Sequence, residues 1–449
     1  MNIALCHFRV GETDGVSLEM DKWKYVLEKM GHNVYFISGS ESLVKSQIID
    51  SLHYNSNLNN KILKNSFEEL SDFHDEELKK LILENAGSIE NELFECVNKN
   101  NIDIIVPNNI LSLGYNLSAA IAFNQLLNRC KSLKIIAHHH DFFWERQKYS
   151  NPTTKFIKEI LATYFPIKHE RVKHVVINKI AQNELKTRRD IYSTVVPNVF
   201  DFENSKWVKD QFNANFREKI GIDENDIVFL QATRIVERKG IELAIDVVSE
   251  ITNNENLKTK LYNSKLYDGR KFSDKNKIYL ILAGIIDNEE EYFDKLIEYA
   301  KSKNVNILHI NSVIKHEREL TETQKYYSLW DSYVISDFVT YPSLLEGWGN
   351  QFIEAVIAKK PILVYEYPVF EKDIKSYGFD IVSLGNSHKI KNNNLVEIDK
   401  NTIEKSAKEC VELLINQDKR KHTTENNYTI GKNNFDYKNL QGLLKEILQ

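Results

Sequence analysis

Two cations near the middle of the sequence have the spacing of a phosphate-binding site. Arg234 and Lys239 stand in the segment QATRIVERKG (231–240), which joins an apolar run that predicts a strand to a segment with helical spacing. Cations at such a junction favour a diphosphate, because the first N–H groups and the dipole of the helix attract the same negative charge. The alternative interpretation is a solvated surface turn, since like charges are common there.

Two carboxylates accompany a glycine loop in the segment YPSLLEGWGNQFIEA (341–355). The pattern predicts a buried strand before the loop and a helix after it, with Glu346 at the loop tip and Glu354 in the helix. Gly347 and Gly349 allow a ligand to approach the backbone closely. A carboxylate accepts two hydrogen bonds at once, which suits neighbouring hydroxyls of a ribose or a hexose. Exposed, solvated glutamates are the alternative interpretation.

Three consecutive histidines, His138 to His140, directly follow another predicted strand. Adjacent side chains of an extended segment point to opposite faces, so the three imidazoles are poorly placed to hold one metal ion. The pattern favours a polar role for one of them in a ligand site. His140, beside Asp141, is placed to orient or polarise a substrate hydroxyl. We therefore expect no metal site here.

The elements that must position these residues alternate between strands and helices. Apolar runs predict strands at 2–7, 33–38, 101–108, 133–141, 172–179, 194–198, 226–234, 278–284, 306–310, 337–341, 361–366 and 380–384. Such alternation is typical of an α/β fold with parallel, doubly wound sheets. Ligands bind at the carboxyl ends of such strands, where the candidate residues stand.

The length of 449 residues predicts two domains, because a single hydrophobic core stops growing well below that size. A polar, irregular stretch over 199–216 is the candidate linker. The polar stretch 252–277 lacks an apparent apolar face and predicts a surface excursion. The loop that carries Gly11 and Gly15 after the first strand lacks the full glycine fingerprint of a dinucleotide site.

Composition limits the partners and the compartment. The net charge of −5 and the pI near 6.3 give no basic excess for nucleic acid. The four cysteines (Cys6, Cys96, Cys130 and Cys410) are scattered, which favours a reducing compartment over a disulfide framework or a zinc site. Without a signal peptide pattern, a membrane span or a strong basic amphipathic helix, we expect a cytoplasmic protein; membrane contact stays open without support from the sequence.

These segments resemble the retaining GT-B glycosyltransferases of family 4, the glycosyl transferase group 1 set. EGWGNQFIEA looks like the family signature, and TRIVERKG is similar to its phosphate-binding Arg/Lys pair. The segment 195–203 resembles the Pro-Asn segment that ends the family's N-terminal domain, and 282–310 resembles its next strand–helix–strand. The resemblance covers most of residues 101–390.

The resemblance implies a GT-B fold, in which two Rossmann-like doubly wound domains face a central cleft. Residues 1–200 would form the acceptor side, with the tail 418–449 packed on it, and residues 201–417 would form the donor side. It also implies roles for the candidates. Arg234 and Lys239 would bind the donor diphosphate, and Glu354 the ribose. Glu346 and the backbone of Gly347, Trp348, Gly349 and Asn350 would hold the donor hexose, His140 would lie near the reacting carbon or the acceptor, and Gly15 would face the donor phosphate or the acceptor.

The implied enzyme is a retaining, metal-independent hexosyltransferase with no cofactor beyond its nucleotide-sugar co-substrate. UDP-glucose and GDP-mannose are the expected donors, and the acceptor is a small molecule, a saccharide or a lipid-linked sugar. Two alternatives stay open, namely a nucleotide-sugar-binding subunit without catalysis and a nucleotide-sugar epimerase of the same fold. A phosphorylase would need a pyridoxal-phosphate lysine, and no lysine stands out for that role.

Overall fold

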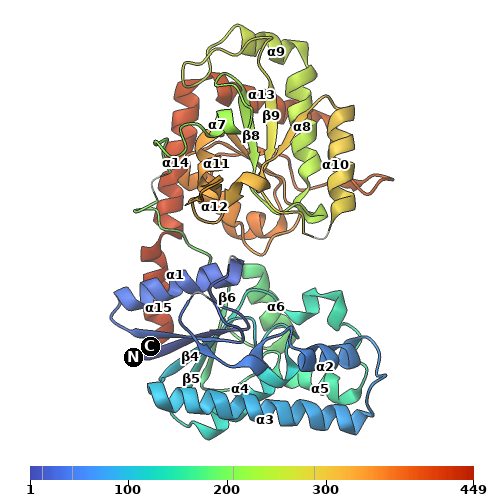
Figure 1. The fold of residues 1–449 in the computed structure, drawn as a ribbon, viewed down its shortest axis with the longest axis vertical. Helices are drawn as coiled ribbons and strands as arrows, with labels where there is room; N and C mark the ends of the chain where they lie inside the picture. The colour runs from blue at the N-terminus through green and yellow to red at the C-terminus, as the bar shows by residue number, and fades with distance from the viewer. Residues whose placement is uncertain (13, 43, 206, 288) are drawn as a thin grey trace. The chain divides into compact units, whose positions relative to one another are not determined.

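The computed structural model describes residues 1–12, 14–42, 44–205, 207–287 and 289–449. The chain divides into two compact units (Figure 1), which are Met1–Val199 together with Tyr437–Gln449, and Phe200–Asp436. Each unit is built around one large parallel sheet.

The first unit contains a seven-stranded sheet in the order β3-β2-β1-β4-β5-β6-β7, with every described pairing parallel. Its strands are β1 (Asn2–His7), β2 (Asn33–Ser38), β3 (Gln47–Ile48), β4 (Ile104–Pro107), β5 (Lys134–His139), β6 (Val172–Val176) and β7 (Thr194–Val195). Its helices are α1 (Gly15–Lys29), α2 (Asn57–Phe67), α3 (Asp75–Asn100), α4 (Leu117–Arg129), α5 (Lys155–Tyr164), α6 (Lys179–Arg189) and α15 (Tyr437–Leu448).

Alternation along β1 shows how this sheet builds two cores. Ile3 and Leu5 are buried in the core that includes α1 and α15. Ala4 and Cys6 are buried in the core that includes α2, α3, α4 and α5. Successive side chains of a strand point to opposite faces, so helices cover both sides of the sheet, with α1 on one side and α3 and α4 on the other (Figure 1).

The second unit contains a six-stranded parallel sheet in the order β10-β9-β8-β14-β15-β16. These strands are β8 (Ile227–Gln231), β9 (Ile278–Leu282), β10 (Asn306–His309), β14 (Phe338–Tyr341), β15 (Ile362–Val364) and β16 (Val382–Ser383). Two small sheets accompany it. One contains β11 (Ile314–Lys315), β12 (Glu319–Leu320) and β13 (Lys325–Ser328), and the other pairs β17 (Lys389–Ile390) with β18 (Val396–Glu397). The helices are α7 (Phe216–Lys219), α8 (Ile241–Asn253), α9 (Glu255–Tyr262), α10 (Glu290–Ser302), α11 (Leu329–Ile335), α12 (Asn350–Ile357), α13 (Lys400–Ile415) and α14 (Gln417–Phe435).

The two large sheets share the strand order 3-2-1-4-5-6 of the Rossmann fold when the strands of each are numbered along the chain. The prediction of two Rossmann-like, doubly wound parallel domains is therefore confirmed. In this order the chain reverses direction across the sheet between the first and fourth strands, and a ligand site is expected beyond their carboxyl ends. Those strands are β1 and β4 in the first unit and β8 and β14 in the second.

Two segments differ from the sequence-based expectation. The sequence predicts that the tail packs on the first unit from residue 418 onward. In the structure α14 packs against α12 and α13 in the second unit, and the tail belongs to the first unit only from Tyr437, where α15 begins. The stretch 252–277 is wrongly predicted as an excursion without an apolar face. Its helix α9 buries Leu257 and Leu261, which are four residues apart and so lie on one side of the helix.

Candidate functional site

The predicted donor residues gather beyond the carboxyl ends of β8 and β14, which are neighbours in the second sheet. Arg234 and Lys239 follow β8, and Glu346 follows β14. A buried polar contact joins the ends of the two strands, where Thr340 Oγ1 donates to Gln231 Oε1 at 2.7 Å. This pairing brings together charges that are more than a hundred residues apart in the chain.

Glu346 lies between two cations. The Lys239 ammonium pairs with one carboxylate oxygen of Glu346, and Arg238 Nη1 lies 3.2 Å from the other. The side chains of Lys239 and Glu346 are only 9% and 11% exposed. Burial raises the pKa of Glu346, but Lys239 and Arg238 outweigh that effect and lower the pKa below its usual value. Glu346 is therefore an ionised carboxylate at neutral pH.

The turn between Lys239 and α8 depends on a glycine. Gly240 has a left-handed backbone with φ +56°, and a Cβ there would lie 2.6 Å from the carbonyl oxygen of Pro342. Beside it, Leu344 N donates to Arg238 O at 2.8 Å. The loop after β8 and the loop after β14 are thus held against each other, which fixes the distance between the cations and Glu346.

Arg234 occupies the outer part of this cluster. Its side chain is half-exposed and pairs with Asp287, which follows β9. Burial lowers the pKa of Lys239, and the charges of Arg238 and Arg234 act in the same direction, against Glu346. Three cations thus share one end of the sheet with the carboxylate of Glu346, an arrangement that suits a diphosphate.

The glycine loop positions backbone groups at the start of α12. Gly349 has φ +153°, and a Cβ on it would collide with the hydroxyl of Tyr367. Trp348 is buried with its ring against Phe435, while its carbonyl oxygen accepts from Tyr367 Oη at 2.6 Å. The indole of Trp348 therefore belongs to the core of the second unit, and the contact predicted between its backbone and the donor hexose stays a prediction. Gly347 precedes this turn, and Asn350 is the first residue of α12.

Glu354 is the fifth residue of α12 and has a tyrosine partner that the sequence analysis missed. Tyr333 on α11 is fully buried and donates from Oη to Glu354 Oε2 at 2.6 Å. Trp207 stacks on Trp330 at 4.2 Å between ring centroids and also lies 5.6 Å from Tyr333. Glu354 is thus oriented by a tyrosine that belongs to an aromatic cluster. The sequence gave no signal for Tyr333, because its contact with Glu354 is tertiary.

In the first unit, His140 is the end of a hydrogen-bonded chain across three neighbouring strands. Asn108 follows β4, and its side-chain Nδ2 donates to Val106 O at 3.1 Å, which leaves Oδ1 to accept from His140 Nε2 at 3.2 Å. The carbonyl of Asn108 accepts from Nδ1 of His7, the last residue of β1, at 2.8 Å. These contacts assign the proton of His140 to Nε2 and leave Nδ1 as the acceptor nitrogen.

His7 and His140, the two histidines of this hydrogen-bonded series, are neutral at pH 7. Burial lowers the pKa of His7 to about 4. Burial, reinforced by His7, lowers the pKa of His140 to about 3. His140 can therefore hold a sugar hydroxyl through hydrogen bonds without carrying charge.

The other two histidines of the run have different surroundings. His138 stacks on Trp23 of α1 at 4.6 Å between ring centroids. His139 Nε2 lies 3.0 Å from Nδ1 of His174 on β6. Within the described parts of the chain, no group of three or more His, Cys, Asp or Glu side chains is arranged to hold a metal ion.

Gly15 is the first residue of α1. Asp14 caps this helix by accepting from Val16 N at 3.0 Å and Ser17 N at 3.3 Å. A Cβ at Gly15 would meet nothing within 4 Å, so packing does not require glycine there. Thr13 of the same loop lies outside the described residues. The role of Gly15 toward a donor or an acceptor stays a prediction.

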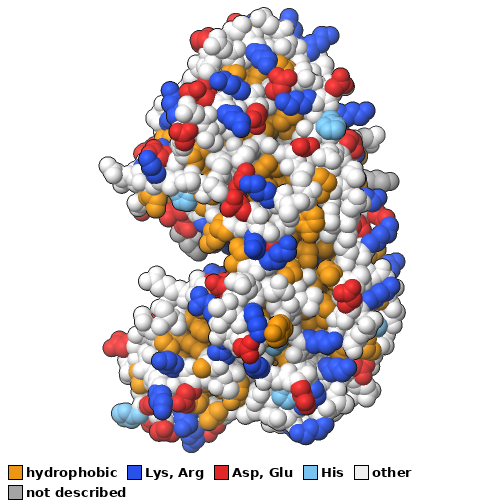
Figure 2. Space-filling view, turned by 180° about the vertical axis from the view of Figure 1, so that it is seen from behind, with side chains coloured by type: hydrophobic (Ala, Val, Ile, Leu, Met, Phe, Trp, Pro, Cys, Tyr) orange, Lys and Arg blue, Asp and Glu red, His pale blue; other side chains and the backbone are white. Residues whose placement is uncertain are grey.

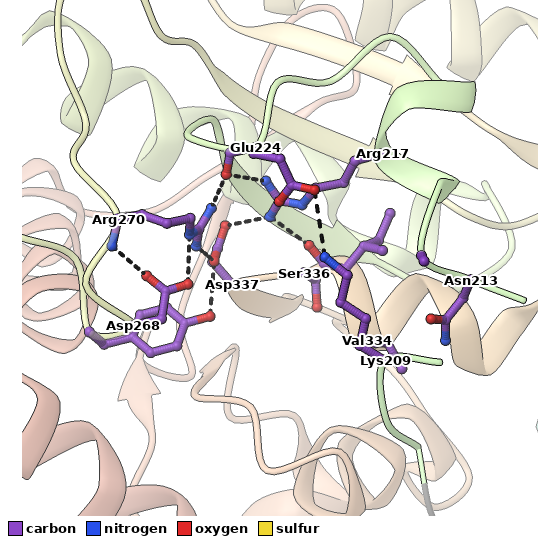
Figure 3. A pocket seen from close by; sticks show the side chains of 12 residues that line it. Lys209, Asn213, Arg217, Glu224, Asp268, Arg270, Val334, Ser336 and Asp337 are labelled. Carbon is purple, nitrogen blue, oxygen red and sulfur yellow. Dashed lines mark hydrogen bonds and ion pairs between the residues drawn. The ribbon is translucent and has the colours of Figure 1, made fainter. Parts of the chain in front are cut away.

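A pocket in the second unit lies at the opposite, amino-terminal edge of the sheet (Figure 3). Asp337 directly precedes β14, and its Oδ2 accepts from Val228 N at 2.8 Å and Arg217 Nη2 at 3.2 Å. Its Oδ1 accepts from Tyr267 Oη at 3.0 Å and from Arg270. Protein donors thus surround this buried carboxylate, and the contacts from Tyr267 and Arg270 attach the stretch after α9 to the sheet.

Two Rossmann-like units, with cations and a buried carboxylate beyond the switch point of the second, define the architecture of a GT-B glycosyltransferase. The family model "Glycosyl transferases group 1" matches residues 212–430. Together with full-length relatives, it shows that the chain belongs to this family of glycosyltransferases, as the resemblance predicted.

The relatives include two bacterial enzymes. The chain is 41% identical over 443 residues to mannosylglucosylglycerate synthase of Petrotoga mobilis, covering 98% of this chain and 99% of that one. It is 41% identical over 451 residues to the enzyme of the same name of Thermotoga maritima, covering both chains fully.

Solved structures share the fold. A glycosyltransferase of Rickettsia africae has a TM-score of 0.63 at 16% identity, over 99% of this chain and 97% of that one. Sucrose-phosphate synthase of Thermosynechococcus elongatus has a TM-score of 0.59 at 11% identity, over 100% of this chain and 98% of that one.

The surface carries mixed charge. On the face shown in Figure 2, basic and acidic side chains are interspersed over both units, in keeping with the small net charge. Among the described residues, no helix combines the length and the apolar character needed to cross a bilayer.

Proposed function

We propose that this glycosyltransferase transfers a mannosyl group from GDP-mannose to glucosylglycerate and forms mannosylglucosylglycerate. The observation that carries the proposal is the 41% identity, over essentially the whole chain, with two synthases named for that product. The product name contains a mannosyl group linked to a glucosylglycerate. GDP-mannose, one of the two donors expected from the sequence, supplies that group.

The cluster beyond β8 and β14 would bind the donor. Lys239, with Arg238 and Arg234, supplies positive charge for the diphosphate, and that charge stabilises the leaving group as the sugar bond breaks. Glu346 and the backbone at the start of α12 accept and donate hydrogen bonds to the hexose. Glu354, oriented by Tyr333, accepts from the ribose hydroxyls.

We propose a retaining, metal-independent reaction. The acceptor hydroxyl oxygen bonds to the anomeric carbon on the face that the diphosphate leaves, the carbon–oxygen bond to the diphosphate breaks, and the leaving diphosphate takes the hydroxyl proton. Both oxygens of Glu346 are engaged by Lys239 and Arg238, so this carboxylate is poorly placed to act as a nucleophile. The three cations would provide the electrostatic stabilisation that a metal ion provides in other enzymes.

The test is a transfer assay with purified protein, GDP-mannose and glucosylglycerate in excess EDTA. We expect GDP release coupled to a product heavier than the acceptor by one hexosyl unit, with an α-anomeric signal in the NMR spectrum that matches the donor. UDP-glucose in place of GDP-mannose should give little product. Conversion of GDP-mannose to another nucleotide sugar would instead identify an epimerase, and nucleotide binding without turnover would identify a binding subunit.

A further inference from the structure

Two tyrosines at the carboxyl-terminal edge of the first sheet form a stacked pair. The rings of Tyr54 and Tyr115 have centroids 5.2 Å apart and an interplanar angle of 28°. Phe8, which directly follows β1, contacts both rings at 6.0 and 5.8 Å. Both tyrosines are partly exposed, whereas Phe8 is buried, so the pair presents aromatic surface on a rigid base.

Buried asparagines hold the tyrosine pair in place. Asn59 Nδ2 donates to the carbonyl oxygens of both tyrosines, at 2.6 Å to Tyr54 and 2.7 Å to Tyr115. Asn116 Nδ2 donates to Ser51 O at 2.9 Å, which joins the same two segments a second time. The pair is therefore organised before any ligand arrives, which reduces the entropy lost on binding.

Arg9 lies at one end of the pair. It follows β1, and its guanidinium carbon lies 5.6 Å from the ring centroid of Tyr54. Its partners are Glu12 at 3.0 Å and Asp14 at 3.7 Å. Asp14 interacts electrostatically with His7 and His140, so Arg9 belongs to the surroundings of the candidate catalytic histidine.

Arg146 lies near the other tyrosine. It follows β5, interacts electrostatically with Tyr115 and pairs with Asp141 at 3.3 Å. Asp141 is the neighbour of His140 in the chain. Each arginine thus pairs with an acidic residue near His140, Arg9 with Asp14 and Arg146 with Asp141, and each lies beside one ring of the tyrosine pair.

We propose that Arg9 and Arg146 bind the carboxylate of the acceptor and that Tyr54 and Tyr115 pack against its sugar ring. This proposal rests on the proposed function. It deepens that function by assigning the acidic end of the acceptor to named residues. A planar guanidinium matches a carboxylate with two parallel hydrogen bonds, and aromatic side chains line most sites for small molecules. The ligand class is a glycoside of a hydroxy acid.

Both arginines can exchange their present partners for such a ligand with little loss of stability. Their present partners are partly exposed carboxylates, with side-chain exposures of 42% for Glu12, 23% for Asp14 and 36% for Asp141. Ion pairs exposed to solvent contribute little to stability, so a ligand carboxylate held by both guanidinium groups can replace them.

The test compares binding of two acceptors by calorimetry in the presence of GDP. Glucosylglycerate carries the carboxylate, and glucosylglycerol is its neutral counterpart. We expect the wild-type protein to bind glucosylglycerate at least about tenfold more tightly, which is the usual scale for hydrogen bonds to a charged group. Arg9→Met and Arg146→Met should each remove most of this preference without changing the affinity for GDP.

The matched control is Arg129→Met. Arg129 also combines an ion pair, to Glu90 at 3.0 Å, with an aromatic contact, 3.4 Å from the ring centroid of Phe94, but it stands at the end of α4, before β5 begins. This variant should keep the full preference. Two variants at the site protect the test against misfolding of either one, which circular dichroism would reveal.

The outcomes separate the two proposals. A preference for glucosylglycerate that both site variants lose supports the subsite, whether or not mannosyl transfer occurs. An equal affinity of the wild type for the two acceptors, undetectable binding of both, or a preference that survives in folded Arg9→Met and Arg146→Met overturns it. Binding with the expected preference but without transfer from GDP-mannose would contradict the proposed function alone.

Discussion

Strand β14 has a buried carboxylate at each end, and the two carboxylates have different surroundings. Asp337 precedes the strand and accepts hydrogen bonds from Val228 N, Arg217, Tyr267 and Arg270. Glu346 follows the strand and is engaged by Lys239 and Arg238. Burial raises the pKa of both groups, but neighbouring cations outweigh it, so both pKa values lie below the usual range.

The two clusters differ in how many hydrogen-bond donors of their cations remain available for a ligand. Arg217 and Arg270 also donate to backbone carbonyl oxygens, including that of Asp226 at 3.0 and 2.9 Å, and so connect several segments of the second unit. The ammonium of Lys239 has three donors, and Glu346 takes one. Arginines that connect several segments stabilise a fold, whereas an ammonium with donors to spare can bind an anion. The predictions for Asp337 and Lys239 test this comparison directly, and those for His7 and Tyr333 extend it to other buried groups.

The largest effect is expected at Asp337. Asp337→Ala should lower the free energy of unfolding by about 3–5 kcal/mol, because it leaves buried arginines without their carboxylate. Chemical denaturation measures this change. The control Glu224→Ala removes a carboxylate from the same pocket whose contact with Lys209 is exposed, and it should change stability by less than about 1 kcal/mol. Equal effects of the two substitutions would contradict the structural role of Asp337.

At the other end, Lys239→Ala should act on catalysis. Loss of this cation should lower kcat by on the order of 100-fold or more, about 3 kcal/mol of barrier, since it faces the charge that develops on the leaving diphosphate. Steady-state transfer kinetics measure the loss. Lys260→Ala removes a surface lysine paired with Glu412 in the same unit and should leave kcat within about twofold. Near-normal activity of folded Lys239→Ala would refute its role.

The first unit contains a buried histidine, His7, for which burial outweighs the nearby carboxylate of Asp14. The pKa of His7 is about 4 in the folded protein, through burial, against 6.5 as its usual value. Between these values the unfolded chain binds more protons, so stability falls as the pH falls, by about 3 kcal/mol for this group at pH 4. Denaturation curves from pH 7 to pH 4 measure the slope. His7→Gln cannot titrate and should show a shallower slope; superimposable slopes would contradict the assignment.

The smallest effect concerns the ribose site. Tyr333→Phe removes the hydroxyl that donates to Glu354 and keeps the buried ring. We expect a loss of about 1 kcal/mol in donor binding, roughly a fivefold rise in KM for the nucleotide sugar. Kinetics at varied donor concentration detect it. Tyr326→Phe, on β13 beside Lys315, provides the control tyrosine, and an equal change in both variants would argue against orientation of Glu354.

Much of this arrangement follows from local pattern. The loops that carry Arg234, Lys239 and Glu346 directly follow apolar runs, so both the strands and the placement of these residues at strand ends were predictable. Adjacency of β8 and β14 then brings Lys239 to Glu346. That contact joins residues 107 positions apart, so the motifs alone did not predict that the two side chains would pair.

Other features depend on tertiary packing that no local pattern reveals. The chain from His7 through Asn108 to His140 uses the neighbouring ends of β1, β4 and β5. The stretch 252–277 reads as polar because its helix α9 buries only Leu257 and Leu261, and the further buried residues Leu266 and Phe272 lie outside any helix. Its attachment to Asp337 through Arg270 appears only once the sheet is assembled.

The most direct test of the central claim is hydrogen exchange of the backbone amides with and without GDP-mannose. Amides that a bound ligand covers or orders exchange more slowly. The account predicts protection in residues 234–240 and 343–354, beside Lys239 and Glu346. Protection in residues 209–217, 267–270 and 334–337 would instead place the donor in the pocket around Asp337 and would contradict the account.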